Sequence, residues 1–245
     1  MPPEIFFKGQ GLLALTSDAS LDFTPADFDQ PLTAPQREYL QKACGRDIPQ
    51  VFWRKQVHGD EVLVVKSRDR HDFLDTSTTI KVVPVTTFTE ADAYITNTKN
   101  LPIAIRTADC VPVFIFDPEH QAVGLAHAGW KGTFKGIAAK TAKLMQERYS
   151  SYFSDLKIVL GPSIRQCCYQ VGPEFREFFP ADLKERERHL YLDVVNSNRR
   201  QLLQLGVRPD NIFDCGLCTC CSKNFFSHRR DGAKAARMIS IMMLT

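Results

Sequence analysis

Three apolar segments follow one another closely in the middle of the chain, and they constrain the fold more than any other feature. They span residues 103–107, 111–116 and 122–126, each long enough for a strand but short for a helix. Because almost every residue in them is apolar, we expect a packed sheet covered on at least one face. Further strands are predicted at residues 51–53, 61–65, 80–85, 93–96, 157–160, 211–213 and 238–242.

Helical periodicity is clearest in the segment that follows these strands. From Thr133, the expected N-cap, to Tyr149, apolar side chains recur at three- and four-residue intervals and polar side chains fill the other face. Other helices are predicted at residues 35–44 and from Asp193 as N-cap to a stop at Gly206. Strands and helices mix without strict alternation, which indicates an α+β protein rather than a doubly wound parallel sheet.

The composition excludes several classes of protein. With 44% hydrophobic and 24% charged residues, the chain is typical of a globular protein and not of a disordered one. The net charge is only +3 and the basic residues are dispersed, so we expect no nucleic-acid partner. We expect no membrane association either, because no segment approaches the roughly 20 apolar residues of a membrane helix. The first residues lack a secretory signal, so we expect a cytoplasmic protein whose eight cysteines are thiols.

Three tight turns carry the side chains that are most typical of an active site. His58 precedes a glycine, Cys110 opens an apolar strand, and His127 ends a strand just before the long helix. Two histidines and one cysteine from strand ends can form a three-ligand zinc site that leaves a position for water. The same residues fit a hydrolase with Cys110 as nucleophile and His127 as base. A structural cysteine beside two hydrogen-bonded histidines is the third interpretation.

The remaining cysteines outside the first helix form two groups. Cys167 and Cys168 are adjacent, and we expect buried thiols that act as small apolar side chains, since neighbouring cysteines rarely pair. The second group contains Cys215, Cys218, Cys220 and Cys221. A second metal in this group is the alternative to free thiols, although a structural zinc site usually needs two separated pairs of ligands.

Taken together, these segments resemble one protein family. The matching segments are Gln-Val-His-Gly (56–59), Ala-Asp-Cys-Val-Pro-Val (108–113), His-Ala-Gly-Trp-Lys-Gly (127–132), Gly-Pro-Ser-Ile…Cys-Cys-Tyr-Gln-Val-Gly (161–172), Cys-Thr (218–219) and Phe-Phe-Ser-His-Arg-Arg (225–230). Their order and spacing are similar to those of the laccase-domain family, also called polyphenol-oxidase-like or peptidoglycan-editing-factor-like. Its members have been recast as purine nucleoside phosphorylases. The likeness covers about residues 50–245, and departures at Lys131, His228 and 235–237 concern the shape of the pocket.

The resemblance implies an α+β fold, namely a four-layer α/β/β/α sandwich with mixed sheets that forms one compact domain over residues 1–245. It also implies that His58, Cys110 and His127 bind one zinc ion, in agreement with the trio reached from residue chemistry. The implied reactions are phosphorolysis of adenosine, inosine, guanosine and methylthioadenosine, and deamination of adenosine. A purine nucleoside and phosphate are therefore the expected small-molecule partners.

These reactions suggest roles for residues inside the matching segments. Cys110, His127 and Asp109 form the expected catalytic set, with Asp109 as a proton shuttle or as a residue that orients the ligands. A turn-capping role is the alternative for Asp109. The basic residues that could hold phosphate are Arg106, Lys131, Arg229 and Arg237. The amides of residues 129–132 could assist them at the start of the helix.

Other activities stay open at this point. The chain has six histidines and no His-x-His pair, so a conventional multicopper laccase is excluded. Copper bound at the single His/Cys site could still support weak phenol oxidation. The peptidoglycan-editing name suggests amide hydrolysis of a nucleotide-linked muramyl amino acid. A metal-binding protein without catalytic activity is the last alternative.

Overall fold

The central apolar segments build two stacked sheets in the computed structural model, which describes residues 4–9, 11–24, 31–66 and 90–245. The larger sheet contains, in spatial order, β12 (Ile212–Asp214), β8 (Lys157–Leu160), β6 (Val111–Asp117), β7 (Ala122–Ala128), β4 (Ala93–Thr96) and β3 (Val62–Val64). This sheet is mixed, because β12–β8 and β3–β4 are parallel while the other pairs are antiparallel.

The smaller sheet lies against the larger one. Its strands, in spatial order, are β1 (Glu4–Gly9), β2 (Leu12–Thr16), β13 (Met238–Leu244) and β5 (Ile103–Thr107). All three pairs are antiparallel, and isolated parallel bridges join Phe52 to Ile103 in β5 and Lys99 to Leu244 in β13. The expectation of mixed sheets is therefore met in full only by the larger sheet.

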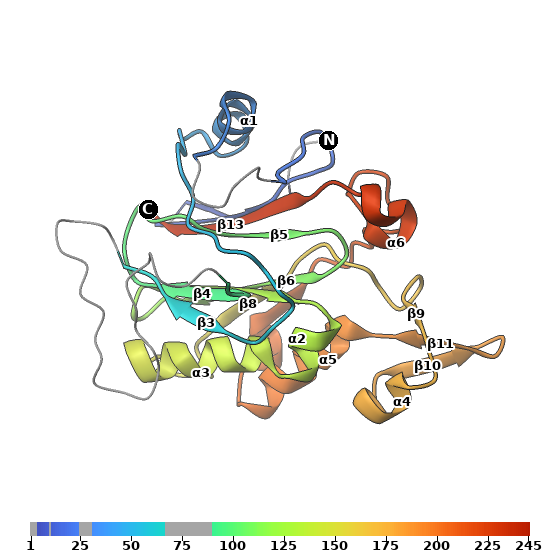
Figure 1. The fold of residues 1–245 in the computed structure, drawn as a ribbon. Helices are drawn as coiled ribbons and strands as arrows, with labels where there is room; N and C mark the ends of the chain where they lie inside the picture. Colours follow the sequence, from blue (N-terminus) through green and yellow to red (C-terminus); the bar gives the residue numbers. More distant parts are fainter. Residues whose placement is uncertain (1–3, 10, 25–30, 67–89) are drawn as a thin grey trace.

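Helices cover the outer faces of both sheets, so the layers run α/β/β/α (Figure 1). The helix α1 (Ala34–Cys44) lies over the smaller sheet, and α3 (Ile137–Tyr149) and α5 (Val194–Gln204) lie under the larger one. Shorter elements complete the fold: α2 (Trp130–Phe134), α4 (Phe175–Phe178), α6 (His228–Asp231), two 3-10 turns (Pro209–Asn211 and Gly232–Lys234), and a sheet of β10 (Leu183–Arg186), β11 (His189–Leu192) and β9 (Gln170–Val171). The four-layer α+β fold implied by the resemblance is confirmed.

Three hydrophobic clusters fill the three spaces between the layers. In β13, Ile239 and Ile241 pack toward α1, whereas Met242 and Leu244 pack toward the other sheet. A third cluster joins the larger sheet to α3 and α5. Because both faces of the central strands are covered, these strands are apolar throughout instead of alternating with polar residues.

Most predicted elements form where the apolar pattern places them. The strands predicted at 93–96, 103–107 and 157–160 match β4, β5 and β8 residue for residue. The strand predicted at 51–53 is reduced to the bridge at Phe52, and the one predicted at 80–85 lies outside the described residues.

The long helix predicted from Thr133 to Tyr149 is wrong at its start. The structure has a short helix, α2, whose N-cap is Gly129, and then a new helix that begins at Ile137. The break lies at Gly136, which has φ 79°, a left-handed conformation that glycine adopts readily. Thr133 is thus not an N-cap, and its hydroxyl instead accepts a hydrogen bond from Asn198 Nδ2 (2.9 Å). In the part of the chain that the structure describes, no helix could span a membrane.

Candidate metal centre and its cavity

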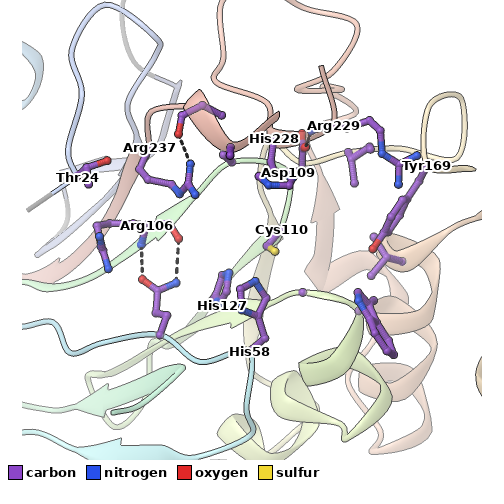
Figure 2. A pocket seen from close by; sticks show the side chains of 18 residues that line it. Thr24, His58, Arg106, Asp109, Cys110, His127, Tyr169, His228, Arg229 and Arg237 are labelled. Carbon is purple, nitrogen blue, oxygen red and sulfur yellow. Dashed lines mark hydrogen bonds between the residues drawn. The ribbon is translucent and has the colours of Figure 1, made fainter. Parts of the chain in front are cut away.

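A cavity of about 690 Å³ opens beside the ends of β5, β6 and β7, where the predicted site residues converge (Figure 2). The predicted residues that line it are His58, Arg106, Asp109, Cys110, His127, Arg229 and Arg237. Figure 2 shows Cys110, His127 and His58 together at its floor, with Arg106 and Arg237 on one side and Tyr169 on the other. The turns that the sequence places far apart therefore meet at one site.

His127 is held in a fixed orientation by Asp92, which immediately precedes β4. The imidazole Nδ1 lies 2.8 Å from Asp92 Oδ1, and the His127 backbone N–H donates to the Asp92 carbonyl oxygen (2.7 Å). Both side chains are buried. Because Nδ1 forms a hydrogen bond with the carboxylate, Nε2 is the nitrogen of His127 that can serve as a ligand. This arrangement is typical of metal-binding histidines.

The same carboxylate holds the turn that carries His58. The backbone N–H groups of Val57, His58 and Gly59 donate to Asp92 at 3.1, 3.0 and 2.8 Å. His58 has φ 57°, a left-handed conformation that costs energy for a residue with a side chain. Burial would raise the pKa of Asp92, but His127 and these backbone donors lower it overall. Asp92 thus positions both histidines.

Gln56 fastens this turn to β5. Its side-chain oxygen accepts from the Arg106 backbone N–H (2.8 Å), and its side-chain nitrogen donates to the Arg106 carbonyl (2.8 Å). The side-chain amide of Gln56 therefore makes the pair of hydrogen bonds with Arg106 that a neighbouring strand would otherwise make with β5. This contact gives a structural reason for the glutamine in the Gln-Val-His-Gly segment.

The three candidate ligands lie close enough to bind a single ion. One donor atom from each of His58, Cys110 and His127 lies within 4.8 Å of the other two. Burial raises the pKa of the Cys110 thiol, but the charge of His127 and hydrogen bonds from both histidines lower it to about 6. The pKa of His127 rises to about 9, because Cys110 and Asp92 outweigh the effect of burial. Two imidazoles and a thiolate form a set of donors that fits a three-ligand metal site.

Gly129 has no side chain, and the side chains of Cys110 and His58 occupy the space beside it. A Cβ atom at this position would lie 2.9 Å from Cys110 Sγ and 2.9 Å from His58 Cδ2. Any side chain here would displace two of the three candidate ligands. The glycine is therefore required by close packing, and its backbone, with φ −72°, is not strained.

Asp109 is the one carboxylate among the described residues that line the cavity, and both of its oxygens are engaged. Oδ1 accepts from the Thr219 hydroxyl (2.6 Å), and Oδ2 accepts from the Arg229 backbone N–H (2.6 Å). Its φ of 94° places it in a tight turn ahead of β6. The carboxylate thus ties the turn before Cys110 to two segments near the end of the chain.

The four predicted phosphate-binding residues take three different positions: Arg106 and Arg237 lie together, Arg229 lies apart from them, and Lys131 lies outside the cavity. Arg106 and Arg237 lie on the same side of the cavity, near Thr24 (Figure 2). Arg229 lies near Tyr169, where its Nη1 donates to the carbonyls of Cys168 (3.3 Å) and Gln170 (2.8 Å).

Lys131 does not line the cavity. It is exposed, with its ammonium 5.6 Å from the centre of the Trp130 ring. Its neighbour Trp130 lines the cavity instead, and consecutive residues of a helix point in different directions. The prediction that Lys131 holds phosphate is therefore not supported by its position.

An apolar wall that the sequence did not identify completes the cavity. Its members are Trp130, Ile164, Tyr169 and Val194. Three of them, Trp130, Ile164 and Tyr169, lie inside the matching segments. The motifs therefore contained these residues but did not indicate that they line one cavity. Asp92 lies outside every matching segment, and the only sequence signal for it is an acidic residue directly before an apolar strand.

The other cysteines do not behave as the sequence suggested. Cys167 is exposed and Cys168 is half-buried, so the prediction of buried thiols is wrong. Sulfur atoms of Cys167, Cys168, Cys218 and Cys221 lie within 4.8 Å of one another. Cys215 and Cys220 are not part of this set, so the expected cluster at 215–221 contributes only two of its thiols.

Comparisons with known proteins agree with the resemblance seen in the motifs. A family model described as "Multi-copper polyphenol oxidoreductase laccase" matches residues 16–245. A purine nucleoside phosphorylase of Aquifex aeolicus is 42% identical over 155 residues, which are 63% of this chain and 72% of that protein. Purine nucleoside phosphorylase YlmD of Bacillus subtilis is 35% identical over 216 residues, covering 84% and 75%. The crystal structure of YlmD from Geobacillus stearothermophilus superimposes with a TM-score of 0.79 at 28% identity, covering 96% and 92%.

Proposed function

The chain belongs to the family described as multi-copper polyphenol oxidoreductase laccase, and from this premise we propose that it is a zinc-dependent purine nucleoside phosphorylase. The relatives named purine nucleoside phosphorylase support this reaction. The observation that carries the proposal is the cavity itself, which combines three candidate metal ligands, two arginines on one side and an apolar wall. Adenosine, inosine, guanosine and methylthioadenosine are the proposed substrates.

The site fits zinc on several structural grounds. Its donors are two nitrogens and one sulfur, Asp92 orients His127, and Gly129 leaves the room that the ligands need. Three protein ligands are the pattern of catalytic zinc, whereas a multicopper centre needs many more histidines than six. When bound by His58, Cys110 and His127, zinc supplies Lewis-acid polarisation of an oxygen of the substrate or of water.

Arg106 and Arg237 are the proposed phosphate-binding residues. Burial, together with the like charge of Arg237, lowers the pKa of Arg106 to about 10, although the charges of Tyr94 and Asp22 oppose this. Two cations facing the same cavity repel each other, and a bound anion would relieve that repulsion. Phosphate oxygens fit the paired donors of a guanidinium group.

Trp130 and Tyr169 are the proposed partners of the purine ring. Both line the cavity, and stacking on aromatic faces suits a flat base. The volume of about 690 Å³ falls within the range of small-molecule sites. A nucleoside with its base on this wall and its ribose toward the arginines would present C1′ to the phosphate.

Phosphorolysis then needs one bond to form and one to break. A phosphate oxygen forms a bond to ribose C1′, the bond from C1′ to the purine nitrogen breaks, and the base leaves with the electron pair and takes up a proton. The arginines hold the phosphate and balance its charge. Asp109 is proposed as a positioning residue, since both oxygens already accept hydrogen bonds, and it holds the turn that presents Cys110.

Adenosine deamination is the proposed second activity of the same cavity. Water would replace the amino group and release ammonia, with inosine as the product. A metal site that can polarise water beside a purine pocket supports this reaction. Deamination requires no phosphate, so the two reactions are separable by experiment.

Metal-analysed protein incubated with adenosine, with and without phosphate, tests the proposal. Chromatography should detect adenine and ribose 1-phosphate only with phosphate, and inosine in both samples. If zinc-loaded protein yields no product, the proposal is wrong, and hydrolysis of a nucleotide-linked muramyl amino acid becomes the next reaction to assay. Phenol oxidation by the copper-loaded protein without any phosphorolysis would instead support the oxidase alternative.

Replacing Arg106 or Arg237 with glutamine should raise the KM for phosphate by about 10- to 100-fold, because each variant loses a charge-assisted hydrogen bond worth about 1.5–3 kcal/mol. The KM for adenosine should change much less. Initial rates over a range of phosphate concentrations measure this effect. Lys131→Gln is the matched control, because that side chain lies outside the cavity. A larger effect in the control than in the arginine variants would contradict the assignment.

A further inference from the structure

A second group of candidate ligands lies outside the cavity. The sulfur atoms of Cys167, Cys168, Cys218 and Cys221 all lie within 4.8 Å of one another. Cys221 Sγ is 3.2 Å from Cys168 Sγ and 3.5 Å from Cys167 Sγ. The group combines an adjacent pair with a Cys-x-x-Cys pair about 50 residues later in the chain. A structural zinc site takes four protein ligands, usually from two separated pairs, and this group supplies four thiols from two such pairs.

We propose that Cys167, Cys168, Cys218 and Cys221 bind a second zinc ion, which is structural and joins the two segments that carry them. Tetrahedral zinc with Zn–S bonds of about 2.3 Å places its sulfur ligands about 3.8 Å apart. The observed spacing is compatible with one ion at the centre of all four sulfurs. Four thiolates without oxygen ligands select a soft metal rather than magnesium or calcium. All four positions would be filled by protein, which distinguishes this site from the three-ligand site in the cavity.

The backbone brings the two segments together independently of any metal. Ser163 and Cys218 form a parallel bridge, with the Ser163 N–H donating to the Leu217 carbonyl (3.2 Å) and the Thr219 N–H donating to the Ser163 carbonyl (3.1 Å). The Ser222 N–H donates to the Cys218 carbonyl (3.1 Å), which closes a turn around the Cys-x-x-Cys pair. The fold thus places the four thiols together in advance.

Cys215 belongs to the same segment but lies outside this group. Its Sγ is 3.5 Å from Arg165 Nη2 and is not part of the quartet.

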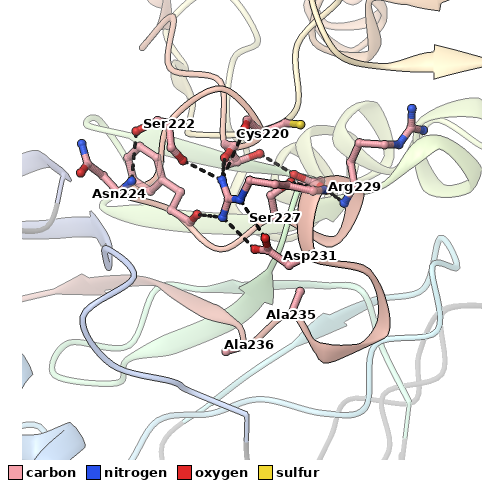
Figure 3. A network of polar contacts seen from close by, with 12 residues as sticks. Cys220, Ser222, Asn224, Ser227, Arg229, Asp231, Ala235 and Ala236 are labelled. Carbon is pink, nitrogen blue, oxygen red and sulfur yellow. Dashed lines mark hydrogen bonds and ion pairs between the residues drawn. The ribbon is translucent and has the colours of Figure 1, made fainter.

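Three arginines contact the backbone of the two segments that carry the group. Four thiolates around a divalent ion carry a net charge of −2. Arg186 Nη2 lies 3.2 Å from the Cys167 carbonyl, and Arg229 Nη1 lies 3.3 Å from the Cys168 carbonyl. Arg230 Nη1 donates to the carbonyls of Thr219 (3.0 Å) and Ser222 (2.9 Å), in the polar network of Figure 3. Cations at both segments favour an anionic metal centre.

The proposed zinc would support one wall of the cavity. Tyr169 directly follows Cys168 and lines the cavity, and Arg229 donates to the carbonyl of Cys168. Thr219 directly follows Cys218, and its hydroxyl holds Asp109. The ion would therefore fix residues on both sides of the turn before Cys110 without touching a substrate. This inference does not depend on the nucleoside activity.

Metal analysis of protein purified without chelator tests the proposal directly. We expect two zinc ions per chain in the wild-type protein and one in Cys218→Ser and Cys221→Ser. Cys215→Ser is the matched control, because it lies in the same segment and should retain two. One zinc ion in the wild type that persists in Cys218→Ser would overturn the proposal. So would iron in place of zinc, or a disulfide that involves Cys221 in the freshly purified protein.

A second measurement leaves the quartet intact, so it remains decisive even if the serine variants fail to fold. Cys110→Ala should lose the zinc of the cavity and retain only the proposed structural zinc. Zinc X-ray absorption of this variant should then show four sulfur ligands at about 2.3 Å and no nitrogen. A zinc-free variant, or a shell that contains nitrogen or oxygen, would contradict the assignment.

Discussion

Cys110→Ala and His127→Ala are each expected to remove one metal ion per chain and to lower kcat/KM for adenosine phosphorolysis about a thousandfold or more, while the protein remains folded. A Lewis-acid metal contributes several kcal/mol to catalysis, and about 1.4 kcal/mol corresponds to a factor of ten. Each variant removes one of only three protein ligands. Zinc per chain, the melting temperature and steady-state rates are the measurements.

The fold should survive because these side chains lie at the floor of the cavity and not within the three hydrophobic clusters. Cys215→Ala and His120→Ala are suitable controls, since neither side chain lines the cavity. Full metal content and full activity in both the Cys110 and the His127 variants would refute the assignment of the site. Loss of the folded structure in both would show that the trio is structural.

Asp92→Asn is expected to weaken metal binding by about 10- to 100-fold and to lower the free energy of unfolding by about 2–4 kcal/mol. The carboxylate accepts from three backbone N–H groups and contacts His127 Nδ1. Asparagine replaces one acceptor oxygen with a donor, which would face these N–H groups inside a fully buried site. Metal titration and chemical denaturation measure the two effects.

Asp182→Asn is the control that separates the role of Asp92 at the candidate metal site from ordinary structural support. Asp182 is also buried, and it accepts hydrogen bonds from Ser197 Oγ (2.7 Å) and Asn196 Nδ2 (3.0 Å), away from the candidate ligands. This control should lose stability and keep its metal affinity. If both variants lose stability and neither loses metal affinity, Asp92 does not position the histidines.

The candidate ligands were predictable from residue type and local context. His58, Cys110 and His127 each stand at a tight turn beside an apolar strand, and their chemistry makes a three-ligand zinc site one of three interpretations. Asp92 was not predictable, because its importance lies in four contacts with residues about 35 positions away in either direction. Its own neighbourhood offers one weak signal only, its position directly before an apolar strand.

Lys131 illustrates a different failure. Its place in the His-Ala-Gly-Trp-Lys-Gly segment suggests a role at the phosphate, but consecutive residues of a helix point in different directions. The helix begins at Trp130 and is interrupted at Gly136, and Trp130 rather than Lys131 lines the cavity. Apolar periodicity continues across the interruption, and the pattern therefore could not reveal it.

Local patterns in the sequence predict most strands of the two stacked sheets, the three longest helices and the three candidate ligands, because apolar spacing, turn residues and ligand chemistry are local properties. Which distant groups meet follows from the packed fold: Asp92 contacts both histidine segments, and Cys167 and Cys168 lie beside Cys218 and Cys221. Those encounters depend on how the layers stack and on how the segment near Ser163 pairs with the segment near Cys218. A contact between residues far apart in the chain is set by the packing of the whole fold, and no local pattern records it.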